Sequence, residues 1–237
     1  MDNIFNPSPS LPEFVGRTVL DTIGLVIPAI DPSLRSEMNL PDHIHALGLI
    51  SSRTGAAGQI TAVDEAIKNT RATLISVELP RDTKGWGGHG NYIVMGSRDI
   101  SDVRQAVEIA LELTRRNAGE VYINNAGHLE FAFSASAGEA LAAAFDAPVG
   151  QAFGFMAGSP AAIGLVMADK ALKSASVSLI RYMTPDRGTS HSNEVIIAFT
   201  GDASAVKTAV LTAREVGLEL ISAMGEYPCG PSAPYLN

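Results

Sequence analysis

Two loops rich in glycine, serine and histidine are the parts of this sequence best suited to chemistry. The first comprises Gly85, Trp86, Gly87, Gly88, His89 and Gly90, and the second comprises Thr189, Ser190, His191, Ser192 and Asn193. Glycine lets a backbone approach an axis or a ligand closely and adopt a positive φ. Exposed amides, hydroxyls and two imidazoles could hydrogen-bond to a small polar molecule. A flexible surface turn is the other interpretation that these residues leave open.

The same loops do not match the patterns of common reactive sites. No Gly-Lys-Ser/Thr follows Gly90, so a phosphate-binding loop is not indicated. His89 has no carboxylate or thiol beside it in its loop, and His43 and His45 form a pair without an evident third metal ligand. No Gly-x-Ser-x-Gly elbow occurs, and Cys229 lies on a Pro/Gly-rich tail without a basic neighbour. We therefore expect no catalytic residue, no metal site and no cofactor.

Composition narrows the class of protein. The net charge of −8 and the pI of about 5.1 argue against nucleic acid or anionic lipid as a partner. Charged residues make up 18% of the chain, and this low share suggests that other subunits cover part of the surface. No apolar run is long enough to span a membrane, and the polar N-terminus does not resemble a secretory signal. We expect a cytoplasmic protein.

The chain repeats itself at shifts of 103 to 106 residues. Residues 64–80 match residues 169–185 at six of 17 positions, and residues 99–107 match residues 202–210 at five of nine. Residues 45–50 also match residues 151–156, so three blocks recur in the same order. Ordered self-similarity of this kind marks a duplicated structural unit. We divide the chain into a flexible segment (1–15), two domains (16–120 and 121–226) and an irregular tail (227–237).

Each repeat has the pattern of an α+β domain, in the order strand, helix, strand, helix, strand, strand, helix. Apolar residues at helical spacing predict a long helix after residue 101, capped by Ser101, and its counterpart after residue 204, capped by Ser204. Shorter helices are expected at residues 62–69 and 167–174. A hinge rich in Asn and Gly is expected at residues 117–127.

The order of these motifs resembles a known family. Ala-Leu-Gly-Leu-Ile at 46–50, Val-Asp-Glu-Ala-Ile-Lys at 63–68 and Ala-Asp-Lys-Ala-Leu-Lys at 168–173 are similar to the bacterial microcompartment shell domain. A strand that follows the last helix in simple members comes first here, at 23–28 and 129–134, as in circularly permuted members. Motifs at 12–16, 80–84, 87–90 and 214–218 resemble the subtype found in propanediol- and ethanol-utilisation compartments.

The resemblance implies a fold and an assembly. It implies two tandem permuted domains, each a ferredoxin-like α/β sandwich, and a homotrimer that forms a six-sided pseudohexamer. Such discs would join other shell proteins edge to edge, with Lys68 and Lys173 at the tile edges. The two glycine-rich loops would line pores for small polar metabolites such as a diol, an alcohol or an aldehyde.

The resemblance therefore favours a structural shell tile, not an enzyme, located in the microcompartment shell. A trimeric small-molecule-binding protein or enzyme with sites between subunits is the alternative. Two interpretations of residues 1–15 stay open: a tether for encapsulated enzymes, or a disordered segment.

Overall fold

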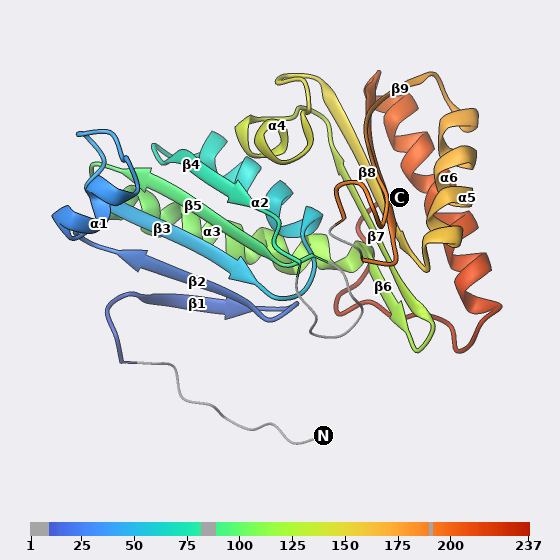
Figure 1. Cartoon of the computed structure of the whole chain (residues 1–237), viewed down its shortest axis with the longest axis horizontal. Helices are drawn as coiled ribbons and strands as arrows, with labels where there is room; N and C mark the ends of the chain where they lie inside the picture. The colour runs from blue at the N-terminus through green and yellow to red at the C-terminus, as the bar shows by residue number, and fades with distance from the viewer. Residues whose placement is uncertain (1–9, 82–88, 190–191) are drawn as a thin grey trace.

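The computed structural model describes residues 10–81, 89–189 and 192–237. Within them the chain forms two α+β repeats, each a five-stranded antiparallel sheet packed against two long helices (Figure 1), which confirms the predicted fold class. The first repeat contains β1 (Phe14–Thr18), β2 (Thr22–Ile27), α1 (Pro32–Glu37), β3 (Ala46–Ser52), α2 (Ala57–Lys68), β4 (Thr73–Glu78), β5 (Asn91–Ser97) and α3 (Ile100–Asn117). After η1 (Ala118–Glu120), the second contains β6 (Val121–Asn124), β7 (Gly127–Ser134), α4 (Glu139–Phe145), β8 (Ala152–Ser159), α5 (Ala161–Ser174), β9 (Val177–Met183), β10 (Val195–Gly201) and α6 (Ala203–Ser222).

The two sheets have the same topology, as duplication requires. Their strand orders are β1-β2-β3-β5-β4 and β6-β7-β8-β10-β9. The registers also correspond, because Ile27 pairs with Leu47 in the first sheet and Ser134 pairs with Phe153 in the second. Residues of the matched strands therefore have structural counterparts in the other repeat.

The long helices bury the faces that their sequence pattern predicts. The apolar stripe of α3 packs on β1, β2, β3 and β5, and that of α6 packs on β7 and β8. The fully buried members of these stripes are Val103, Ala106, Val107 and Ala110 in α3 and Val206, Ala209, Val210 and Ala213 in α6. Burial of such side chains contributes roughly 1.5–3 kcal/mol for each valine.

The starts of four helices differ from the sequence-based expectation. Asp99 and Asp202 occupy the N-cap positions of α3 and α6, so the predicted caps Ser101 and Ser204 are wrong. The reason is the short connection: α3 begins three residues after β5 ends, and α6 begins two residues after β10 ends. Helices α2 and α5 begin at Ala57 and Ala161, about one turn or more before the expected starts at residues 62 and 167.

Two edge strands were also not expected. β1 lies at the border of the segment predicted to be flexible, and β6 lies inside the predicted hinge at residues 117–127. Both are short, and both are held by pairing with the next strand along the chain. The local sequence does not indicate such strands, because pairing in the folded sheet is what stabilises them.

The repeats share one hydrophobic core. Leu141 and Phe145 of α4 and Phe155 of β8 belong to the same buried cluster as Ile60 and Val63 of α2. Figure 1 shows α4 and β7 of the second repeat beside α2 of the first. Among the described residues, no helix is long and apolar enough to cross a membrane.

The C-terminal tail is irregular but fixed in place. Glu120, which has no exposed surface, accepts hydrogen bonds from the backbone amides of Tyr235 (2.9 Å) and Leu236 (2.8 Å). Arg214 of α6 lies 3.0 Å from the same carboxylate and donates to the Leu236 carbonyl oxygen at 2.7 Å. The Arg116 guanidinium of α3 lies over the Tyr235 ring. The tail thereby ties the first repeat to the second.

Candidate functional site

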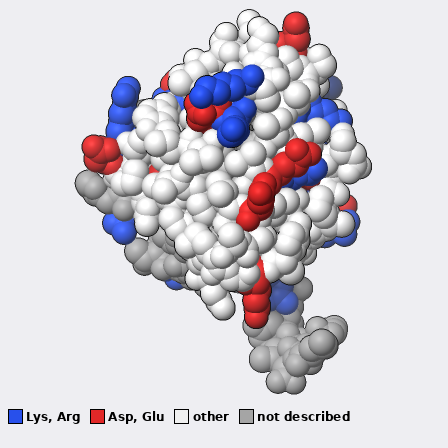
Figure 2. All heavy atoms as spheres, turned by 90° about the vertical axis from the view of Figure 1, so that its right-hand side faces the viewer, with Lys and Arg blue, Asp and Glu red and all other residues white. Residues whose placement is uncertain are grey.

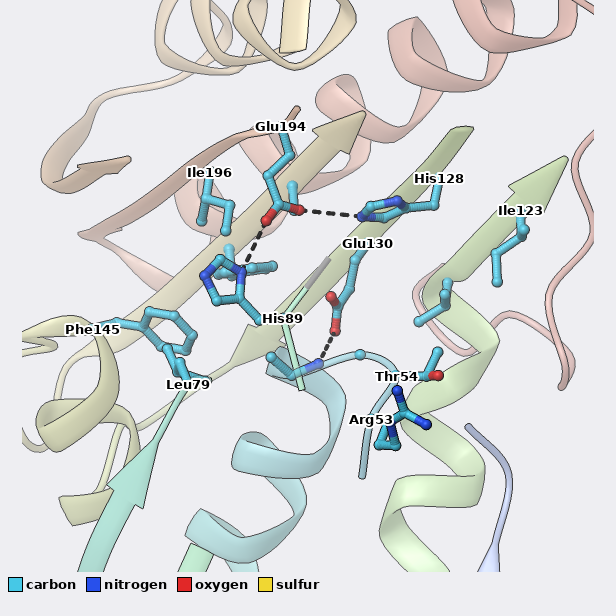
Figure 3. A pocket seen from close by; sticks show the side chains of 15 residues that line it. Arg53, Thr54, Leu79, His89, Ile123, His128, Glu130, Phe145, Glu194 and Ile196 are labelled. Atoms are coloured by element: carbon cyan, nitrogen blue, oxygen red, sulfur yellow. Dashed lines mark hydrogen bonds and ion pairs between the residues drawn. The ribbon is translucent and has the colours of Figure 1, made fainter. Parts of the chain in front are cut away.

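A pocket lies between the two repeats and draws its walls from both. The first repeat contributes the segment between β3 and α2 (residues 53–56), Leu79 and His89. The second repeat contributes side chains of β6, β7, α4, β8 and β10 together with Glu194. The pocket has about 600 Å³ of space, its open mouth included, and Figure 3 shows its lining. Because it forms at the junction, it exists only when the repeats are docked.

A buried His–Glu–His cluster lies in this pocket. Nδ1 of His89 lies 2.9 Å from Oε1 of Glu194, and Nε2 of His128 lies 3.3 Å from Oε2 of the same carboxylate (Figure 3). His89 precedes β5 in the first repeat, whereas His128 starts β7 and Glu194 precedes β10 in the second. All three side chains are buried. The His89–Glu194 contact therefore joins the two repeats through a charge-assisted pair.

A second carboxylate, Glu130 on β7, lies beside this cluster and serves the start of α2. Its Oε1 accepts hydrogen bonds from the backbone amides of Ala56 and Gly58, both at 3.3 Å. Helix α2 has no side-chain cap of its own, so the second repeat supplies the hydrogen-bond acceptor that its first turn needs.

The two carboxyl groups have opposite electrostatic settings. Burial by itself would raise the pKa of Glu194, but hydrogen bonds and charge from His128 and His89 outweigh burial and leave that pKa below its usual value. Burial raises the pKa of Glu130 above its usual value, against the lowering effect of the Ala56 and Gly58 amides and of His128. The cluster thus favours an ionised Glu194 and disfavours an ionised Glu130.

The pocket can bind a small molecule that both donates and accepts hydrogen bonds. Nδ1 of His128 is buried and has no hydrogen-bond partner within the described residues. Leu79, Phe145 and Ile196 supply apolar wall beside it. A few polar groups converging in an apolar cavity are typical of small-molecule sites. No group of three or more His, Cys, Asp or Glu in the described part of the chain is arranged to hold a metal ion.

The structure describes only some residues of the two predicted loops. Gly85, Trp86, Gly87, Gly88, Ser190 and His191 lie outside the described residues. His89 and Gly90 are buried, and the Gly90 amide donates to the Pro80 carbonyl oxygen at 2.9 Å. Of the described residues of this loop, His89 lines the pocket.

The described residues of the second loop hold the backbone of the loop together. Thr189 and Ser192 are buried, and the Thr189 hydroxyl contacts the carbonyl oxygens of Thr184 and Ser192. Asn193 is exposed, and its Oδ1 accepts a hydrogen bond from the Ala161 amide at the start of α5 (3.1 Å).

Sequence reasoning missed most of the pocket. Glu194, His128 and Glu130 were not among the expected site residues. One local signal existed for Glu130, because a carboxylate within the otherwise apolar Leu-Glu-Phe-Ala-Phe of β7 must find a partner when buried. His43 and His45 are both exposed on either side of buried Ile44.

Lys68 and Lys173 occupy matching positions but have different surroundings. Lys68 pairs with Asp64 at 2.8 Å and donates to the carbonyl oxygen of Ser136 in the second repeat. Lys173 pairs with Asp169 at 2.7 Å, and its side chain is 72% exposed. Lys68 therefore donates to a backbone carbonyl of its own chain, and the contacts of both lysines at a tile edge stay a prediction.

Comparison with known proteins identifies relatives of the whole chain. The BMC domain family matches residues 46–126 and 152–228, one match in each repeat. The bacterial microcompartment shell protein PduB of Citrobacter freundii is 46% identical over 227 residues, which cover 96% of this chain and 84% of that protein. PduB of Limosilactobacillus reuteri is 46% identical over 238 residues and is covered completely.

Solved structures agree with these relatives. A trimeric bacterial microcompartment shell protein PduB superposes with a TM-score of 0.90 at 47% identity, over 95% of this chain and all of that chain. EtuB from Clostridium kluyveri superposes with a TM-score of 0.92 at 45% identity, over 96% of this chain and all of that chain. The likeness extends through both repeats.

Proposed function

Since this chain belongs to the bacterial microcompartment shell proteins, we propose that it is a structural tile of a shell of the propanediol- or ethanol-utilisation type. Three copies form a disc with six quasi-equivalent domains, and discs join other shell proteins edge to edge. The observation that carries the proposal is the match of both repeats, over nearly the full chain, to PduB, of which one solved example is trimeric. This relationship favours a structural role over an enzymatic one.

The pocket between the repeats is the second part of the proposal. It binds or passes a small polar metabolite, such as a vicinal diol, whose hydroxyl groups hydrogen-bond to the His–Glu–His cluster. The burial of these groups supports a ligand that replaces their lost contacts with water. The glycine-rich loops at residues 85–90 and 189–193 stay our candidates for pore lining.

Ligand-detected NMR with 1,2-propanediol tests the pocket. We expect Glu194→Gln and His128→Ala to weaken binding by roughly fivefold or more, because each removes about 1 kcal/mol of hydrogen bonding. Glu112→Gln, on the exposed side of α3, is the control and should leave binding unchanged. Equal binding by all four proteins would place the diol elsewhere, and turnover of the diol that depends on His89 would favour the enzymatic alternative.

The outward contacts of the tile are proposals as well. Lys68 and Lys173 are the candidate edge residues, and residues 1–15 are the candidate tether for encapsulated enzymes. Electron microscopy of Lys68→Ala and Lys173→Ala proteins tests the edges: trimers that no longer grow into sheets would support the role. Sheets that form as readily as those of the unaltered protein would contradict it.

A further inference from the structure

The junction between the repeats depends on a buried aspartate. Asp64 of α2 is fully buried and accepts hydrogen bonds from the backbone amides of Gly138 (2.8 Å), Ala140 (3.0 Å) and Leu141 (3.2 Å). These amides form the start of α4 in the second repeat. Gly138, the N-cap residue of α4, has no side chain to satisfy them. The first repeat therefore supplies the anion that α4 needs, and Lys68 balances its charge.

The matching face of the second repeat is exposed in the described part of the chain. Asp169 and Lys173 of α5 correspond to Asp64 and Lys68, but their side chains are 52% and 72% exposed. Leu165 and Val166 of α5 are 51% and 44% exposed, whereas their counterparts on α2 are buried. Figure 2 shows this side of the molecule, where charged side chains are scattered over a largely uncharged surface.

Internal symmetry identifies what covers this face. In the chain, α4 covers α2, and the counterpart of α4 in the first repeat is α1. The N-caps of these two short helices, Asp31 and Gly138, correspond. Backbone hydrogen bonds support the match. The residue before each N-cap donates its amide to the carbonyl oxygen of the residue before the third strand of its repeat: Ile30 to His45 before β3, and Ala137 to Gln151 before β8. A second copy of this chain, presenting α1, therefore fits the face of α5.

The two junctions cannot use the same chemistry. The Asp31 carboxylate accepts from the Ser33 amide at 2.8 Å, so α1 already carries its own anion. At α4 the Asp64 carboxylate occupies the corresponding position, because it accepts from the amide of Ala140, the counterpart of Ser33. A Cβ atom at Gly138 would lie only 2.8 Å from Oδ1 of Asp64, so an aspartate there leaves no room for a second carboxylate.

We propose that Lys173 of one copy bridges its own Asp169 and Asp31 of the neighbouring copy, and that this three-charge contact replaces the buried Asp64 cap at the junction between copies. The inference rests on the trimer proposed above. Lys173 already lies 2.7 Å from Asp169, and its side chain is exposed. Lys68 would be exposed in the same way if the second repeat did not cover it. Two facing carboxylates need a cation between them. The junction between copies is thus an ion-pair contact that forms between complete, self-capped chains.

The cap that Asn193 provides is a second difference between the junction within a chain and the junction between copies. Its side chain caps the start of α5 from within the second repeat, whereas the start of α2 is capped by Glu130 from the other repeat. Glu130 corresponds to Ile23 of the first repeat, which is apolar and partly exposed. A neighbouring copy would therefore bring Ile23 toward the start of α5, which needs no anion.

A charge-deletion cycle read by the trimer dissociation constant tests the inference. We expect Lys173→Ala to weaken the trimer by roughly tenfold or more, because it leaves two carboxylates facing each other. Asp31→Asn in the same chain should recover most of that loss, because it removes one of the two charges. Lys68→Ala is the matched control: it should lower thermal stability and leave the dissociation constant unchanged.

The outcomes separate this inference from the proposed function. A trimer that weakens equally in Lys173→Ala and in Asp31→Asn/Lys173→Ala overturns the bridge. So does a Lys173→Ala trimer of normal strength, whether or not it still grows into sheets. An unaltered chain that stays monomeric overturns the proposed function and this inference together.

Discussion

Asp64 is a carboxylate whose hydrogen-bond partners are backbone amides of the other repeat. Replacing it by alanine leaves three amides at the start of α4 without an acceptor in a buried setting. We expect Asp64→Ala to lower the free energy of unfolding by about 2–4 kcal/mol in urea titrations. Glu112→Ala, on an exposed ion pair, should leave it nearly unchanged. Similar values for both variants would show that the cap contributes little.

Glu194 makes stability depend on pH. Its folded pKa lies below the usual 4.5, so its contribution is complete above that value and is lost as pH falls through the lower folded pKa. Urea midpoints should therefore fall more steeply between about pH 5 and pH 3 for the unaltered protein than for Glu194→Gln. Glu130 has the opposite tendency, and part of it comes from the Glu194 charge, so the comparison reports the two carboxyl groups together. Parallel curves would contradict this role of the His–Glu–His cluster.

At the scale of the element, periodic patterns predicted the cores of the helices better than their ends. The apolar stripes of α3 and α6 are local, and a stripe at helical spacing has one low-energy way to be buried. The start of α2 is not local, because the acceptor for its first amides is Glu130 of the other repeat. β6 was not predicted for the same reason: its stability comes from pairing with β7.

The C-terminal tail is an element defined by one buried carboxylate. Glu120→Ala removes the acceptor for the Tyr235 and Leu236 amides and the ion pair of Arg214. We expect faster hydrogen exchange over residues 226–237 and cleavage there by carboxypeptidase, while amides of β8 and β10 keep their protection. Glu112→Ala again serves as the control. An unchanged exchange pattern in the tail would show that packing of Leu236 alone holds it.

At the scale of the molecule, duplication and family resemblance predicted the fold and the role of a shell protein. They did not predict the pocket, because the pocket is made where two repeats meet and its residues are far apart in the sequence. His89 was found through its loop, whereas His128 and Glu194 carry no distinctive pattern at all. Sequence symmetry also suggested that Lys68 and Lys173 are equivalent, yet only Lys68 has a partner repeat in the chain.

The central claim, a trimeric tile, is tested most directly by the solution mass from light scattering, followed by negative-stain imaging of larger material. The account predicts a mass of about 74 kDa, three times the 24.8 kDa of the chain, and growth of these trimers into flat sheets or tubes. A uniform monomer or dimer that never forms sheets at any concentration would contradict it.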